Sequence, residues 1–95
     1  MDKRMEYVEK LSAQIVEWDA QIDQLKIKST SASPEERLEY SGTIAALQNK
    51  RDEAASRLQN ISAASDDKWE DLKIGTEQLW GDLNKMLGDA IKKIK

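Results

Sequence analysis

Apolar residues recur every seven positions through the first third of the chain. The pattern has two columns, one formed by Met1, Val8, Ile15 and Ile22 and the other by Leu11, Trp18 and Leu25. The alternating spacing of three and four residues lines one side of an α-helix and is typical of a helix that packs along another helix. We therefore expect a helix over residues 2–29, with Asp2 at its N-cap and Lys26 and Lys28 near its C-terminal dipole.

A second helix is predicted over residues 34–62, after a short polar turn. Ser33 can act as the N-cap, Pro34 suits the first helical position, and Glu36 completes a capping box with Ser33. The short connection makes the two helices antiparallel. The apolar seam of the second helix passes through Ile44, Leu47, Ala54, Leu58 and Ile61. We expect this seam to meet the first helix.

Arg51 interrupts that seam, because it occupies the column between Ile44 and Leu58. We expect its aliphatic stem to lie along the seam while its guanidinium reaches water. The alternative is that Arg51 fixes the register of the two helices at some cost in stability.

Residues 62–67 allow two interpretations. The absence of Gly and Pro favours one long helix that is bent or locally rewound at this point, since the apolar column through Leu58 and Leu72 persists across it. Ser65 followed by Asp66 and Asp67 resembles a helix start, however, so a true turn leading to a third helix over residues 66–94 is the alternative.

The last third of the chain carries a broader apolar face than a two-column seam. We predict that it is an association face made of Trp69, Leu72, Leu79, Trp80, Leu83, Met86, Leu87 and Ile91. Gly75, Gly81 and Gly88 each weaken an isolated helix by nearly 1 kcal/mol relative to alanine. Packing or a surface must therefore supply the order of this segment.

The amino-acid composition argues against an enzyme active site or a metal site. The chain has no cysteine and no histidine, which removes thiol catalysis, zinc-thiolate sites and the commonest general base. Its serines have no base partner, and the acidic cluster at 66–71 lacks the glycine turn typical of calcium sites. We expect no enzyme activity, no catalytic, cofactor-binding or metal site, and no small-molecule substrate.

Charge and hydropathy narrow the range of partners. The chain has 95 residues, 35% of them charged, with a net charge of −3 and both signs spread evenly, so no basic face for nucleic acid is expected. No apolar run reaches the length of a transmembrane helix, and the N-terminus is too polar for a secretory signal. We expect a cytoplasmic location.

Four short segments resemble a family of bacterial proteins described only as coiled-coil domain-containing. They are EYVEKL at 6–11, EWDA at 17–20, KRDEA at 50–54 and KWEDLK at 68–73. The resemblance implies a bacterial, intracellular, all-helical protein with no assigned activity, and some members of the family look stress-associated. No functional residue can be transferred, because the shared motif is itself a packing pattern.

The predicted architecture is all-α: a single helical domain over 1–95 in which an antiparallel hairpin continues into a long or kinked C-terminal helix. We expect it to assemble into a helical bundle as a homo-oligomer, with a dimer favoured; a compact three-helix chain is the competitor. The predicted function is that of a non-enzymatic structural or interaction protein which self-associates through its heptad seams. The alternative is a stress-protective amphipathic helix that binds membrane surfaces or exposed apolar surfaces of client proteins through residues 66–95.

Overall fold

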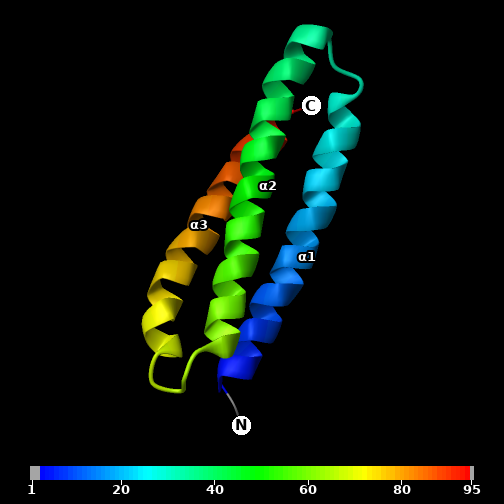
Figure 1. The fold of residues 1–95 in the computed structure, drawn as a ribbon. Helices are drawn as coiled ribbons and strands as arrows, with labels where there is room; N and C mark the ends of the chain where they lie inside the picture. The colour runs from blue at the N-terminus through cyan, green and yellow to red at the C-terminus, as the bar shows by residue number, and fades with distance from the viewer. Residues whose placement is uncertain (1–2, 95) are drawn as a thin grey trace.

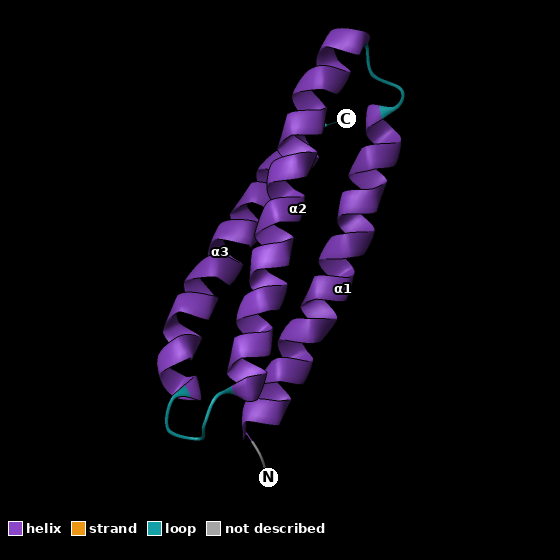
Figure 2. Ribbon diagram, in the orientation of Figure 1, coloured by secondary structure: helices purple, strands orange, loops and turns teal. Residues whose placement is uncertain are grey.

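Three α-helices make up residues 3–94, the part of the chain that the computed structural model describes (Figure 1). They are α1 (Lys3–Ser29), α2 (Pro34–Ala63) and α3 (Trp69–Lys93). The helices run up, down and up, and form a rod with extents of 51 × 19 × 18 Å. Two loops join them, and the described residues contain no strand (Figure 2). The predicted all-α fold is confirmed, while the Met1 and Asp2 predictions lie outside the described residues.

The hairpin of α1 and α2 is built on the two seams. On α1, Leu11, Ile15, Trp18, Ile22 and Leu25 are buried, and Val8 packs partly buried against them. The α2 side of the core consists of Tyr40, Ile44, Leu47, Ala54, Leu58 and Ile61. Burial of each large apolar side chain stabilises the fold by about 1.5–3 kcal/mol. Most of the buried residues of this interface lie at the predicted heptad positions.

The start of α2 has the predicted capping box. The Glu36 backbone N–H donates to the Ser33 hydroxyl at 3.3 Å, and the Ser33 backbone N–H donates to the Glu36 carboxylate at 3.4 Å. Hydrogen bonds from the Ser33 hydroxyl and then from the Tyr40 hydroxyl lower the pKa of Glu36. A lowered carboxylate pKa means that the contribution of this cap is present at neutral pH and disappears as the pH falls through that pKa.

Residues 64–68 form a turn, so the favoured prediction of one long helix is wrong. Ala64 leaves the helix with an extended backbone, φ −72° and ψ 155°, and α3 folds back along α2. The alternative, a turn followed by a third helix, is the observed arrangement, although α3 begins at Trp69 with Lys68 at its N-cap and no side chain caps it. The physical reason for the turn is burial: folding back covers the broad apolar face of α3, which outweighs the few helical hydrogen bonds lost.

Most of the predicted association face is buried in the core of its own chain, and its role in association stays a prediction. Five of its eight residues are buried against the hairpin, namely Trp69, Leu79, Trp80, Leu83 and Leu87. Leu72 and Met86 are half-buried, and Ile91 is 46% exposed. The broad stripe is wide because α3 packs against two helices, a requirement that a hairpin arm alone does not have.

Arg51 remains 31% exposed at its side chain, as expected for a guanidinium that reaches water, and it also pairs with α1. Its Nε donates to Asp19 Oδ1 at 2.8 Å and its Nη2 donates to Asp19 Oδ2 at 3.0 Å. This hydrogen bonding to Asp19 raises the pKa of Arg51. The two-point geometry favours this register of α1 against α2.

The contribution of this ion pair to stability can be measured with a double-mutant cycle. We expect Asp19→Asn and Arg51→Met to couple by about 1 kcal/mol, since the pair is bidentate but remains partly exposed. The coupling should shrink in about 1 M salt, because the Debye length falls there to about 3 Å from about 10 Å at 0.1 M. Additive effects of the two substitutions in urea unfolding would contradict a register-fixing pair.

Candidate functional site

The 64–68 turn lies beside the first turn of α1 and is held there by Arg4 (Figure 1). The Arg4 guanidinium donates to the Ala64 carbonyl and lies 3.6 Å from the Asp66 carboxylate. The last turn of α2 contains no basic residue of its own. Arg4 therefore supplies, from another helix, the cation that the C-terminal dipole of α2 favours.

Aromatic side chains bridge α1 and α3, the two helices whose backbones approach each other least. Trp18 and Trp80 lie with ring centroids 4.9 Å apart, and Tyr7 and Trp69 lie 6.0 Å apart. The Trp18 indole N–H also donates to Asn84 Oδ1 at 3.1 Å. Tilted aromatic pairs of this kind add about 0.5–1.5 kcal/mol beyond the area that they bury.

A groove of about 310 Å³ runs along this α1/α3 interface. Its lining consists of Tyr7, Lys10, Leu11, Gln14, Glu77, Trp80, Gly81 and Asn84. A Cβ added at Gly81 would meet no atom within 4 Å. We refer to this space as the α1/α3 groove.

Three buried side-chain polar atoms among the described residues have no hydrogen-bond partner, and all three belong to residues that line the α1/α3 groove. They are the Tyr7 hydroxyl, Gln14 Oε1 and Trp80 Nε1. A buried polar atom without a partner costs about 1–3 kcal/mol. All three therefore belong to side chains at the α1/α3 interface.

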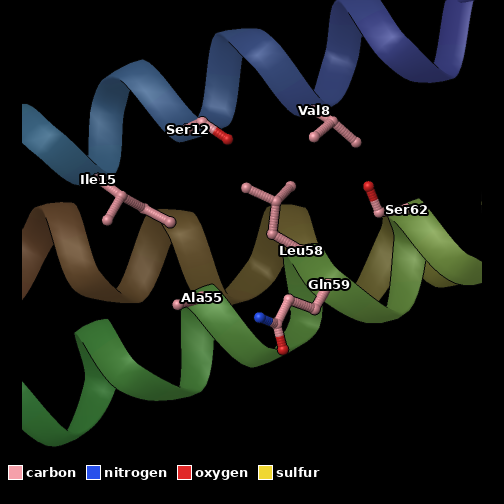
Figure 3. Close-up of a pocket in the computed structure, with 7 residues that line it drawn as sticks. All are labelled: Val8, Ser12, Ile15, Ala55, Leu58, Gln59 and Ser62. Carbon is pink, nitrogen blue, oxygen red and sulfur yellow. The ribbon is translucent and has the colours of Figure 1, made fainter.

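A second groove, of about 320 Å³, lies over the α1/α2 seam. Figure 3 shows Val8 and Ser12 entering it from α1, and Leu58 and Ser62 from α2. Its floor is formed by seam residues that the core already uses. None of the residues lining this second groove has a buried polar atom without a partner.

Elsewhere, a groove of about 410 Å³ is lined by charged side chains around the Asp19–Arg51 pair. Large exposed apolar residues are dispersed along the three helices, and no group of three or more acidic residues within 3–94 is placed to hold a metal ion. None of the helices in the same range has the length and apolar character needed to cross a membrane. The candidate sites are therefore the 64–68 turn and the α1/α3 groove.

Sequence reasoning missed the residues that characterise both sites. Arg4, Gln14 and Asn84 occupy polar positions of the helical pattern, and nothing local distinguishes them from solvated residues. Gly81 gave a partial signal, since a glycine inside a helix requires some reason outside the helix itself.

Comparison with known proteins identifies no relative of this chain. No protein-family model matches the chain, and no curated protein and no solved structure matches it either.

Proposed function

We propose that this protein is a non-enzymatic interaction module that forms a homodimer by exchanging α3 between two copies. The observation that carries the proposal is the 64–68 turn, which contains neither Gly nor Pro and has no residue with positive φ. Straightening it joins α2 and α3 into one helix, as the heptad column through Leu58 and Leu72 favours. Exchange of an identical element is a low-cost route to a dimer.

The exchanged dimer keeps the contacts that close the single chain. The α3 of the second copy would bring the same Trp69, Trp80 and Leu83 to the same hairpin surface, so no new surface is required. Only the turn differs between the two forms. The balance therefore depends on concentration and on the free energy of the turn.

Two features of the turn work in opposite directions. Lys68 provides no side-chain cap to α3, and straightening would give the first N–H groups of α3 helical carbonyl partners. The contacts of Arg4 with Ala64 and Asp66 favour the closed form, because a continuous helix would use the Ala64 carbonyl internally. Arg4 thus acts as a latch on the turn.

Two single substitutions should shift the dimer in opposite directions. Asp66→Pro should leave the chain monomeric, because proline suits the position after Ser65 in a turn but costs about 3 kcal/mol inside a helix. Arg4→Gln should raise the dimer fraction by removing the latch. Lys3→Gln, an exposed cation in the same helical turn, is the matched control and should behave as the unaltered chain. The measurement is sedimentation velocity across a concentration series.

A spin-label distance separates exchange from other kinds of dimer. Lys93 Nζ lies 2.8 Å from Glu39 Oε1, so labels on cysteines introduced at these two positions are close together in a closed chain. In a straightened chain the two positions lie 54 residues apart on one continuous helix, which at about 1.5 Å per residue separates them by roughly 80 Å. Doubly labelled chains diluted into unlabelled dimer should show the long distance. A dimer with only the short distance, or monomers at every concentration for all variants, would refute the proposal.

The surface-binding alternative makes a different prediction. Since the apolar face of α3 is turned inward, binding to a vesicle would require the turn to open without a second copy. Flotation with neutral and anionic vesicles, together with a blue shift of tryptophan emission, would support that alternative. No co-flotation is expected from the dimer proposal.

A further inference from the structure

We propose that ionic strength regulates the exchange of α3, because the acidic residues of 66–71 oppose exchange electrostatically. The inference rests on the proposed exchange and concerns the balance between its two forms. We refer to residues 66–71 as the acidic segment. It contains four acids and one base, all of them exposed, namely Asp66, Asp67, Glu70, Asp71 and Lys68. The surroundings of these charges differ between the closed chain and the exchanged dimer.

The closed chain provides partners of opposite charge for the acidic segment. The Asp66 carboxylate lies 3.6 Å from the Arg4 guanidinium. Glu70 and Asp71 lie in the first turn of α3, where the positive end of the helix dipole favours carboxylates. Straightening the turn removes the start of α3 and with it this favourable position. It also frees Arg4 from the Ala64 carbonyl, which the continuous helix would use internally.

The continuous helix places like charges next to each other. Asp66 and Glu70 are four positions apart, and so are Asp67 and Asp71. Residues at this spacing are neighbours on a helix surface, with their Cβ atoms about 5–6 Å apart, and two carboxylates there destabilise the helix. Each copy that straightens therefore acquires two repulsive pairs in the middle of a helix, far from either end of its dipole.

Exchange also brings the acidic segments of two copies together. α2 ends and α3 begins at the same end of the bundle, beside the first turn of α1 (Figure 1). In the exchanged dimer, α3 of each copy packs on α2 of the other. The two continuous helices are then packed neighbours on both sides of the junction and therefore also across it, at an interaxial distance of about 8–10 Å. The bases of the first α1 turn, Lys3 and Arg4, offset only part of the negative charge, since Glu6 lies in the same turn.

Salt should therefore favour the dimer. The Debye length falls from about 30 Å in 10 mM salt to about 3 Å in 1 M salt, which is shorter than the spacing of the repelling charges. Screening weakens the repulsions of the dimer and the attractions of the closed chain, so both effects act in the same direction. Burial of α3 is the same in both forms, so an effect of salt on apolar burial cancels.

The test measures the dimer dissociation constant of the full chain by sedimentation velocity in about 10 mM and about 1 M sodium chloride. We expect the constant to fall about tenfold at the higher concentration, since two copies each lose two repulsive pairs. Asp67→Asn combined with Glu70→Gln removes one member of each pair and leaves the contact between Arg4 and Asp66 in place. This double variant should dimerise more tightly at 10 mM salt and respond several-fold less to added salt.

The matched control is Glu17→Gln combined with Asp82→Asn, which removes one glutamate and one aspartate charge from exposed positions of α1 and α3 away from the turn. It should keep the full salt response. A dimer with the long spin-label distance whose dissociation constant does not fall with salt would overturn the regulation and leave exchange standing. An equal salt response in the Asp67 and Glu70 double variant would also overturn it. A dimer with only the short distance at both salt concentrations would overturn exchange itself, and monomers under all conditions would overturn both.

Discussion

Leu83→Ala should lower the free energy of unfolding by about 3 kcal/mol, the largest loss that we expect from a single substitution in α3. Leu83 is fully buried, with an exposed fraction of 0%, and lies in the core cluster that joins all three helices. Truncation removes the transfer free energy of three carbons and leaves a cavity that packed helices cannot close.

The matched control is Leu38→Ala, which makes the same chemical change at a side chain that is 79% exposed. Its effect should stay within about 0.5 kcal/mol. Both variants are measured by urea unfolding followed by circular dichroism at one chain concentration. A small effect at Leu83 would mean that α3 does not dock on the hairpin.

Trp18→Phe should cost about 2 kcal/mol, and Trp80→Phe about 1 kcal/mol less than that. Both rings are buried and pack on each other, so each substitution loses a similar amount of apolar contact. The difference lies in the indole N–H groups. That of Trp18 donates to Asn84 Oδ1 at 3.1 Å, whereas that of Trp80 has no partner. Removal of an unpaired buried donor relieves a desolvation penalty and offsets part of the lost contact.

The comparison is made by thermal and urea unfolding of the two variants beside the unaltered chain. The order of the two effects is the informative result, because both substitutions change volume equally. If Trp80→Phe proves the more damaging, the Trp80 indole N–H must have a partner in solution.

The interface between α1 and α2 could be predicted in detail because the signals that define it lie close together in the sequence. A seven-residue period states which side of each helix is buried, and Ser33, Pro34 and Glu36 mark where α2 begins. Each of these signals acts within about one helical turn to two heptads of sequence. No knowledge of the third helix is needed to interpret them.

The Arg51 pair and the 64–68 turn could not be predicted in the same way. Asp19 lies 32 positions before Arg51, and only the antiparallel register of α1 and α2 brings the two side chains together. The turn lacks the Gly or Pro that would announce it, so local propensity favoured a continuous helix. Burial of the broad apolar face of α3 against the hairpin favours the turn over a continuous helix. The free energy of that burial is gained only after the hairpin has formed.

The sequence by itself determined that this protein is all helix, where the first two helices lie, and which of their faces meet, because helical period and capping are properties of neighbouring residues. Only the tertiary structure decided that α3 folds back, that Arg4 meets the end of α2, and that the Trp18 indole pairs with Asn84. The Arg4–Ala64 and Trp18–Asn84 hydrogen bonds join residues 60 and 66 positions apart, and all of these features depend on how three helices pack. Packing of that kind is a balance between burial and chain entropy over the whole bundle, which no short window of sequence contains.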